Sequence, residues 1–511
     1  MLTQILSAAV QGVDGYLVRV EVSLAQGLPT FQVVGLPEGA VREGRERVTA
    51  ALQNLGLPLP LKRITVNLAP ADVRKEGSAF DLPIAVGLLA VEGRIAPERL
   101  EGCALVGELG LDGRLRPVRG ALAVATVCRQ AGVRTLVVPE ENAPEAAAVG
   151  GLAVLGARDL GAVRAHLDGG PRLAPVTVDA PGLLGQAPLP GADLAEVRGQ
   201  EHVKRALEVA AAGAHNLLML GPPGSGKTML ARRLPGVLPP LTLDEALEVT
   251  RVHSVAGRLP PGAAILSARP FRAPHHTVSD AGLVGGGSPP RPGEVSLAHH
   301  GVLFLDELPE FHRHVLEVLR QPMEDGAVTL ARARVSTRYP ARFMLVAAMN
   351  PCRCGFHGDG SDRCVCDPGA VARYRGRVSG PLMDRIDLHV EVPPVPFREL
   401  SAEPAGEGSR EVRARVARAR ELQRERFRGD PGVHANAQMG PAQIRRYCQV
   451  SRDVASFLQR AVDRLGLSAR AYHRILRVAR TVADLEGSED VRGQHAAEVV
   501  QYRLLDRWRG A

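Results

Sequence analysis

A glycine-rich loop with one lysine carries the clearest chemical pattern in this sequence of 511 residues. The loop follows a short apolar run at residues 217–220, and a helical pattern follows the loop. In that setting, glycines let backbone N–H groups converge on a phosphate at the start of a helix. Lys227 would reach the β- and γ-phosphates of a nucleotide such as ATP, and Thr228 would bind Mg²⁺. The predicted phosphate-binding residues are Gly221, Pro222, Pro223, Gly224, Ser225, Gly226, Lys227 and Thr228.

Two adjacent carboxylates follow a second apolar run, at residues 302–305. Asp306 suits the coordination shell of Mg²⁺, and Glu307 suits the polarisation of an attacking water. Two acids at the end of a strand can also be simple solvent-exposed residues. Because these two lie downstream of a phosphate-binding loop, we expect them to serve ATP hydrolysis rather than nucleotide binding alone.

Four of the seven cysteines lie within fifteen residues of one another. They form two C-x-C pairs that bracket a loop rich in Gly, Asp and His, and four thiolates make a closed tetrahedral site for structural Zn²⁺. The C-x-C spacing is tighter than the usual C-x₂-C, so free thiols stay open as the alternative. The candidate ligands are Cys352, Cys354, Cys364 and Cys366, whereas Cys103, Cys128 and Cys448 are expected to be buried packing residues.

The composition is that of a globular protein, with 45% hydrophobic and 23% charged residues. The sequence shows neither the ~20-residue apolar stretch that a membrane span needs nor a basic N-terminal region typical of a secretory signal. These features predict a cytoplasmic chain with no membrane partner. The 63 basic and 55 acidic side chains leave a net charge of +8, which suits a polyanionic partner such as DNA.

The residue patterns divide the chain into four parts. Residues 1–167 alternate strand-like and helical patterns and predict an α/β domain. Residues 168–192 are rich in Gly and Pro and predict a linker. Buried strands that alternate with helices over residues 193–396 predict a parallel sheet with helices on both faces, the P-loop core. Residues 397–511 hold the spacing of amphipathic helices and predict a helical lid.

Several short motifs resemble those of the AAA+ ATPases. Asp306–Glu307, Ala348–Pro351 and Ser379–Asp387 look like the Walker B, sensor 1 and arginine-finger motifs. Residues 272–277, 293–298 and 350–354 resemble, more narrowly, the magnesium-chelatase-like group within that superfamily, and in it the bacterial competence proteins. The resemblance covers nearly the whole chain.

The resemblance implies roles for three side chains. Asn350 would orient the hydrolytic water together with the catalytic glutamate. Arg385 would act on the γ-phosphate bound to a neighbouring subunit, and Arg470 would act from the lid, since cations there stabilise the charge of the transition state. A finger that acts between subunits implies a homo-oligomer, normally a hexameric ring. The alternatives are that Arg385 pairs with Asp384 or Asp387, and that Arg470 is an ordinary helix arginine.

The segment 75–117 resembles the Lon-type protease fold, which also occurs in domains without protease activity. Aligned with Lon, Asp81 stands at the position of the nucleophilic serine and Leu122 at that of the lysine. A carboxylate and a leucine do not make an activated serine nucleophile, so we expect no peptidase activity. Ser78 and Lys75 keep the question open, because the alignment can shift by a few positions.

Residues 325–337 alternate around an early glycine and predict a β-hairpin. The hairpin resembles the one that faces the central pore in AAA+ motors of the replicative type. Arg332 and Arg334 would then contact DNA phosphates. The alternative is two solvent-exposed arginines.

Together, these features predict an ATP-hydrolysing hexameric motor that acts on branched or single-stranded DNA without sequence preference. The resemblance adds helicase or branch-migration activity in recombination during natural transformation. Two alternatives stay open: the ATPase subunit of a magnesium chelatase, and an ATP-dependent protein remodeller or Lon-like protease.

Overall fold

A computed structural model describes residues 1–185, 191–332, 335–396, 406–430, 432–466 and 468–503. The chain folds into two compact units. Unit 1 comprises Met1–Gln186, Thr242–Ser267 and Ala331–Tyr339, and unit 2 comprises Ala187–Leu241, Ala268–Leu330 and Pro340–Ala511. Two segments from the middle of the P-loop core therefore pack in unit 1 rather than with the residues that flank them in sequence.

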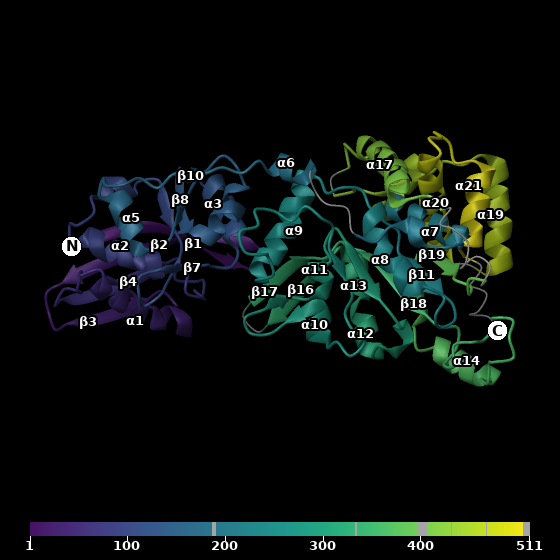
Figure 1. The fold of residues 1–511 in the computed structure, drawn as a ribbon, viewed down its shortest axis with the longest axis horizontal. Coiled ribbons are helices and arrows are strands. Elements are labelled where there is room, and N and C mark those ends of the chain that lie inside the picture. The colour runs from purple at the N-terminus through teal and green to yellow at the C-terminus, as the bar shows by residue number, and fades with distance from the viewer. Residues whose placement is uncertain (186–190, 333–334, 397–405, 431, 467, 504–511) are drawn as a thin grey trace. The chain divides into compact units, whose positions relative to one another are not determined.

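Unit 1 is built on a mixed sheet of eight strands in the order β10-β9-β8-β5-β1-β2-β4-β3 (Figure 1). Val18, Val20 and Val22 are fully buried on one face of β2, as the alternating pattern predicts for a strand with one face on the core. The strands are β1 (Leu2–Gln11), β2 (Asp14–Ala25), β3 (Thr30–Val34), β4 (Arg63–Ala69), β5 (Cys103–Leu105), β8 (Thr135–Pro139), β9 (Ala153–Ala157) and β10 (Pro175–Val176).

The helices of unit 1 include one that is buried on every side, α2, because its sequence is apolar all round. A second, α9, comes from the P-loop core by sequence, and its Ser254 Oγ accepts a hydrogen bond from Gly120 N at 3.0 Å. The longer helices are α1 (Gly39–Asn54), α2 (Asp81–Val91), α3 (Ala121–Gln130), α5 (Leu160–Leu167) and α9 (Leu243–Val255), and the shorter ones are α4 (Ala143–Ala147) and α6 (Ala180–Gly185).

The stretch expected to be a linker carries ordered structure of its own. Strand β10 pairs antiparallel with β9, through Pro175 with Leu155 and Val176 with Val154, and α6 follows it. A sheet edge offers free backbone groups to any extended segment, so a sequence rich in Gly and Pro can still extend the sheet.

Small two-stranded hairpins accompany the main sheets. One joins β6 (Glu108–Leu109) to β7 (Leu115–Arg116), and another joins β16 (Ala327–Arg332) to β17 (Val335–Pro340), where the sequence predicted a hairpin. In β17, Thr337 and Tyr339 are buried. A Cβ placed on Gly12, in the β1–β2 turn, would lie 2.4 Å from Thr337 Cγ2, so the turn and β17 are in direct contact.

Unit 2 contains a parallel five-stranded sheet in the order β12-β15-β18-β11-β19. Every residue of β11, β15 and β18 is buried, because strands covered by helices on both faces meet no solvent. The strands are β11 (Leu217–Leu220), β12 (Phe271–Arg272), β15 (Val302–Leu305), β18 (Met344–Met349) and β19 (Leu388–Glu391), with a small hairpin of β13 (Gly285–Gly286) and β14 (Arg291–Pro292).

Helices cover this sheet and form the C-terminal part of unit 2, drawn in green and yellow in Figure 1. Ser468 caps α20 by accepting from Ala471 N, and Gly487, at φ +69°, follows its end. The helices are α7 (Glu201–Gly213), α8 (Lys227–Val237), α10 (Asp280–Val284), α11 (Glu294–Leu297), α12 (Arg313–Val318), α13 (Arg320–Asp325), α14 (Pro368–Arg375), α15 (Gly380–Met383), α17 (Ser409–Arg426), α18 (Pro441–Tyr447), α19 (Arg452–Leu465), α20 (Ala469–Leu485) and α21 (Gly493–Gln501).

The residue aligned with the Lon serine, Asp81, is held in a buried ion pair. Arg47 Nε lies 2.6 Å from Asp81 Oδ2, and Arg47 Nη2 lies 3.1 Å from Oδ1. Leu109 N also donates to Oδ2, at 3.2 Å. Burial raises the pKa of Asp81, and the hydrogen bonds from Arg47 offset only part of that effect. Asp81 therefore serves the packing of α1 against α2.

The other residues considered as protease catalytic groups, Leu122, Ser78 and Lys75, also have structural roles. Leu122 is buried in α3. Ser78 Oγ donates to Glu108, and Lys75 Nζ donates to Val73 O at 2.6 Å. Within the described part of the chain, no hydrogen bond joins Ser78 to Lys75, so the two do not form a nucleophile–base pair in this conformation.

Asp81→Ala should lower the free energy of unfolding of unit 1 by about 3 kcal/mol, because it leaves the Arg47 guanidinium without its partner in a largely buried setting. The measurement is denaturant unfolding followed by circular dichroism. The matched control is Glu46→Ala, which breaks the exposed Arg45–Glu46 pair in α1, the helix of Arg47. This variant should change the free energy of unfolding little. Equal destabilisation by the two variants would contradict the structural role of Asp81.

Candidate nucleotide-binding and metal sites

The glycine-rich loop lies where β11 ends and α8 begins, at the carboxyl edge of the parallel sheet, the usual ligand edge of such sheets. Gly226 precedes α8 with a φ of +90°, a conformation that favours glycine. A Cβ on Gly221 would lie 2.1 Å from Val392 O. The loop backbone can therefore approach its neighbours only because these positions carry no side chain.

Lys227 joins the loop to the neighbouring strand β18. Its side chain is almost fully buried, and Nζ donates to Gly221 O and Pro222 O at 2.8 Å each. Nζ also donates to Asn350 Oδ1, at the end of β18, at 3.1 Å. Burial lowers the pKa of Lys227, and the nearby charges of Asp306 and Glu307 oppose that effect. The structure thus brings the predicted phosphate lysine and the predicted sensor asparagine together.

The Mg²⁺ ligands predicted from the sequence also meet. Thr228 Oγ1 donates to Asp306 Oδ2 at 2.6 Å, and Asp306 Oδ1 accepts from Glu307 N at 3.0 Å. Hydroxyl and carboxylate oxygens are the donors that Mg²⁺ prefers, and it commonly keeps water and substrate phosphate as its other ligands. The donor set formed by Thr228 and Asp306 therefore fits Mg²⁺ bound together with a nucleotide.

Glu307 sits in a strained backbone conformation beside a histidine. Its φ is +53°, which a non-glycine residue adopts rarely and mostly at functional sites. The carboxylate is about half exposed, and Oε2 lies 3.7 Å from His276 Nδ1. Its exposure leaves the carboxylate accessible to water, and His276 restricts the directions in which it can point.

Arg385 is buried and already paired. Its guanidinium binds Glu324 and donates from Nη1 to Pro381 O at 2.6 Å, so the partner is neither of the two aspartates that the sequence offered. The ion pair borders a cavity of about 560 Å³, also lined by Glu317, Arg320 and Thr329. Residue 385 precedes β19, which runs parallel to β11, so it lies at the opposite edge of the sheet from the P-loop of its own chain.

Arg470 lies in the first turn of α20 and is exposed. Within the described part of the chain it makes no hydrogen bond or ion pair, so the structure does not bring it to the P-loop.

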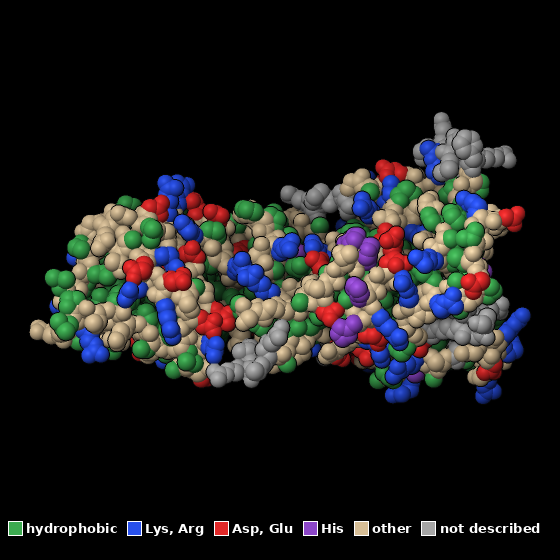
Figure 2. Space-filling view, turned by 90° about the horizontal axis from the view of Figure 1, so that it is seen from below, with side chains coloured by type: hydrophobic (Ala, Val, Ile, Leu, Met, Phe, Trp, Pro, Cys, Tyr) green, Lys and Arg blue, Asp and Glu red, His purple; other side chains and the backbone are tan. Residues whose placement is uncertain are grey.

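The structure gives less information on the two hairpin arginines. Arg334 lies outside the described residues, and so does the side chain of Arg332 at the end of β16. On the face seen in Figure 2, basic and acidic side chains are interspersed.

Gln200 supports the P-loop and was not anticipated from the sequence. Its Nε2 donates to Ser225 O at 2.9 Å and to Pro393 O at 3.0 Å, which ties the loop to the segment after β19. Its φ of +58° is unusual for glutamine. No local pattern marks such a residue, because its two partners are 25 and 193 positions away.

A buried polar network around Asp387 also escaped the sequence analysis. Asp387 Oδ1 accepts from Arg474 at 3.2 Å, and Oδ2 accepts from Asn216 N at 3.1 Å and lies 3.6 Å from His215 Nδ1. His215 Nε2 in turn lies 2.7 Å from Thr481 Oγ1. Burial alone would raise the pKa of Asp387, but His215 and Arg474 lower it below its ordinary value. The network ties helix α20 to the segment that carries Arg385.

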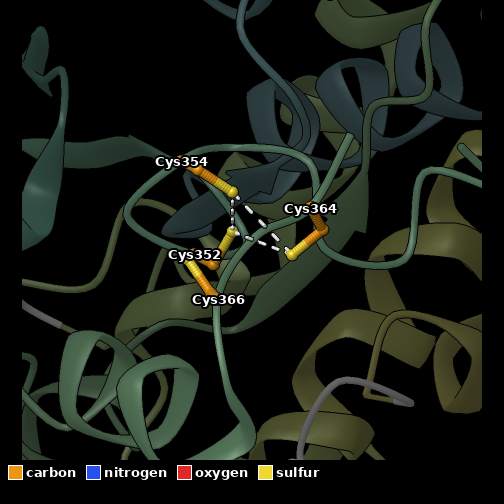
Figure 3. A group of neighbouring side chains, drawn as sticks. All are labelled: Cys352, Cys354, Cys364 and Cys366. Carbon is orange, nitrogen blue, oxygen red and sulfur yellow. Dashed lines mark hydrogen bonds between the residues drawn. The ribbon is translucent and has the colours of Figure 1, made fainter. Parts of the chain in front are cut away.

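The four clustered cysteines converge on one point (Figure 3). The Sγ–Sγ distances are 3.3 Å for Cys352–Cys354, 3.9 Å for Cys352–Cys364 and 3.8 Å for Cys354–Cys364, and all four sulfurs lie within 4.8 Å of one another. A tetrahedron with zinc–sulfur bonds of about 2.3 Å has edges of about 3.8 Å. Cys352 is buried and the other three are partly exposed. The cluster is consistent with a zinc site.

The thiols of the cluster are shifted in opposite directions: the pKa of Cys354 is lowered, whereas the pKa values of Cys364 and Cys366 are raised. Hydrogen bonds, first from Phe356 N–H and then from Cys352, lower the pKa of Cys354 to about 6, and the thiolate is the form that binds metal. Cys103, Cys128 and Cys448 are each buried elsewhere in the fold, as predicted for packing residues.

Comparison with known proteins covers all parts of the chain. Residues 193–400 match the family model "Magnesium chelatase, subunit ChlI", residues 20–142 match "Subunit ChlI of Mg-chelatase", and residues 406–503 match "Magnesium chelatase, subunit ChlI C-terminal". No helix in the described ranges combines the length and apolar character required to cross a membrane.

Three curated proteins show how far the similarity extends. Competence protein ComM of Haemophilus influenzae is 46% identical over 512 residues, covering 99% of this chain and 98% of that protein. Uncharacterized protein YifB of Salmonella typhimurium is 46% identical over 501 residues, covering 98% and 96%. The magnesium-chelatase 38 kDa subunit of Rhodobacter capsulatus is 30% identical over 171 residues, covering only 30% of this chain and 48% of that subunit.

Purified protein should contain about one zinc per chain, because four thiolates satisfy a closed tetrahedral site without water. Metal analysis of protein prepared without chelator is the measurement. Cys352→Ser should lose the metal, whereas Cys448→Ser, a buried cysteine outside the cluster, should keep it. Wild-type protein free of zinc under those conditions would favour four free thiols.

Proposed function

The chain belongs to the magnesium-chelatase ChlI-like family of AAA ATPases, and from that premise we propose that it is an ATP-driven DNA motor. In this proposal it assembles into a ring, normally a hexamer, and moves branched or single-stranded DNA without regard to base sequence. The observation that carries the ATPase part is the meeting of Lys227 with Asn350 and of Thr228 with Asp306 at one edge of the sheet.

The residues divide the chemistry of hydrolysis among them. The loop N–H groups bind the phosphates at the start of α8, and Lys227 exchanges its carbonyl partners for phosphate oxygens. Thr228 and Asp306 would hold Mg²⁺, which would supply positive charge next to the β- and γ-phosphates. Glu307 accepts the proton of the attacking water, and Asn350 orients that water.

The position of Arg385 supports the proposal that a second chain completes the site. The P-loop and Arg385 stand at opposite edges of the sheet, separated by strand β11 of four residues, or ~13 Å at about 3.3 Å per residue. In the proposal, Arg385 serves the nucleotide of a neighbouring subunit, where its charge stabilises the transition state. To do so, it exchanges Glu324 for the γ-phosphate. Arg470 is proposed to reach the phosphates from the lid.

The DNA part of the proposal rests on the relatives and on charge. Competence protein ComM of Haemophilus influenzae matches this chain from end to end, and competence is the uptake of DNA by bacteria. The net charge of +8 suits a polyanion. The hairpin β16–β17 leads directly into β18 and Asn350, so a DNA contact at its tip would be connected to the ATP site.

Two other functions remain as candidates within the same family. A magnesium-chelatase ATPase subunit would account for the family matches, but the chelatase subunit aligns with only 30% of this chain. A protein remodeller would use the same ATPase on polypeptide. ATPase rates with and without four-way DNA separate these possibilities: stimulation supports the DNA motor, and equal rates contradict it.

Lys227→Ala should abolish ATP binding, because it removes the charge that holds the phosphates. Glu307→Gln should bind ATP but hydrolyse it roughly 10³-fold more slowly, since glutamine keeps the shape and cannot accept the proton. Equilibrium binding of a fluorescent ATP analogue and steady-state ATPase assays measure the two effects. Wild-type turnover in Glu307→Gln would refute its assignment as the base.

Arg385→Ala should bind ATP normally and hydrolyse it roughly 10³-fold more slowly, because the neighbour's site loses its finger. Mixing Arg385→Ala with Glu307→Gln subunits should restore part of the activity, since some interfaces then combine an intact Glu307 with an intact Arg385. The readout is ATPase activity against mixing ratio. If mixed rings form and no ratio regains activity, Arg385 does not act between subunits.

DNA affinity should fall by about 100-fold between about 50 and about 200 mM salt if roughly four phosphates are contacted, and should depend little on base sequence. Replacing Arg332 and Arg334 together by alanine should reduce unwinding and DNA-stimulated ATPase more than basal ATPase. The control replaces Arg114 and Arg116, two exposed arginines at the same spacing near another hairpin turn. Wild-type unwinding by the first double variant would show that the β16–β17 hairpin is not the DNA contact.

A further inference from the structure

The cysteine cluster begins directly at the ATP site. Only Pro351 separates Asn350, which accepts the hydrogen bond from Lys227, from the buried ligand Cys352. Pro351 O also accepts from Arg375 Nε of α14, at 3.0 Å. The backbone on both sides of Pro351 is therefore fixed, on one side by the P-loop lysine and on the other by the thiol cluster.

The same loop touches the P-loop from a second direction. Gly355, between Cys354 and the rest of the loop, adopts a φ of +91°. A Cβ placed there would lie 2.5 Å from Pro223 Cδ and 2.6 Å from Pro223 Cγ. Gly355 N donates to Cys352 O at 3.1 Å and closes the turn. The backbone of the cysteine loop thus lies against the P-loop proline.

Apolar packing contributes little to holding this loop in place. Val365, between Cys364 and Cys366, is 86% exposed, and residues 357–363 carry mostly glycine and polar side chains. Closing such a loop costs conformational entropy, which metal binding can offset because ligation contributes directly to folding free energy. Bound metal would therefore determine whether the loop keeps its contacts with the ATP site.

We propose that zinc at Cys352, Cys354, Cys364 and Cys366 is a positioning element of the ATPase. By fixing the cysteine loop it holds Asn350 towards Lys227 and supports Pro223 of the P-loop, so the protein turns over ATP faster in its metal-bound form than without the metal. The inference rests on the ATPase part of the proposed function and is independent of whether DNA is the substrate.

The expected loss is in turnover more than in nucleotide affinity. The P-loop keeps anchors that do not involve the cysteine loop, namely Gly221 N to Met349 O at 3.2 Å and Gln200 Nε2 to Ser225 O at 2.9 Å. The backbone before Asn350 is anchored in the sheet through Met349, but among the described residues the Asn350 side chain hydrogen-bonds only to Lys227, so its direction depends on that contact and on the adjoining loop. A displacement of about 1 Å at a positioned catalytic group lowers rates by up to about 100-fold.

Two variants of one ligand test the role of the metal. Cys364→Ser should lose zinc and at least about tenfold in kcat, with the affinity for a fluorescent ATP analogue changed by less than about threefold. Cys364→His should keep zinc, because Cys₃His is an established ligand set, and should recover most of the turnover. A zinc-free Cys364→Ser protein with wild-type kcat would overturn the proposal.

Two glycine variants separate the contact from the metal. Gly355→Ala should keep zinc and lose turnover, because its Cβ collides with Pro223. Gly358→Ala is the matched control: its φ is +79°, in the same loop, but a Cβ there meets nothing within 4 Å. If the two variants lose turnover equally, strain within the loop rather than the Pro223 contact explains the loss, and the proposed coupling is wrong.

Hydrogen exchange supplies a readout other than activity. Zinc loss should speed the exchange of backbone amides at residues 221–226 and 352–356, and leave the amides of α3 unchanged. A wild-type protein without ATPase activity would contradict the proposed function, yet the exchange result would still decide the inference. Unchanged exchange at residues 221–226 after zinc removal would show that the metal does not support the P-loop.

Discussion

The ammonium of Lys227, almost removed from solvent and held by oxygen acceptors, is the interaction on which the rest of the ATP site depends. Burial of a cation is unfavourable without partners, and the lowered pKa of Lys227 reflects it. The acceptors come from the loop after β11 and from the end of β18, and the compensating negative charge comes from the end of β15. The partners of the Lys227 ammonium therefore come from the ends of β11, β15 and β18. These three strands are neighbours in the parallel sheet and end at the same edge.

The sequence predicted those parts that have a local signature. The apolar runs of β11, β15 and β18 and the glycine-rich loop are contiguous, so their pattern can be read without knowledge of the fold. Gln200 has no such signature. His276 and Asp387 lie in motifs that the sequence shows, but their contacts with Glu307 and Arg474 could not be predicted, because the partners are far away in the chain. The same limit applies to Arg385: its partner Glu324 lies 61 positions earlier, and the sequence offered only the neighbouring aspartates.

The division of the chain into units was also beyond sequence patterns. Helix α9 follows the P-loop helix α8 closely in sequence, yet it packs in unit 1, where Ser254 binds Gly120. The segment 331–339 leaves the ATPase core just before β18 and returns to it, and it too belongs to unit 1. Two segments whose flanking residues belong to the nucleotide-binding core are therefore part of unit 1. Unit 1 is covalently connected to the ATP site through both of them. The cysteine loop starts two positions after Asn350, whereas Thr242 lies 14 positions after Thr228 and Tyr339 lies 11 positions before Asn350.

Movement of a DNA branch point, followed in real time by fluorescence energy transfer across a labelled four-way junction, tests the proposed function most directly. Wild-type protein should move the branch point with ATP and stop when ATP is replaced by a non-hydrolysable analogue. Glu307→Gln should hold the junction without moving it, since it keeps the nucleotide and lacks the base. Wild-type protein that hydrolyses ATP at full rate while the branch point stays in place would contradict a DNA motor. That result would favour one of the other functions of the family for this ATPase.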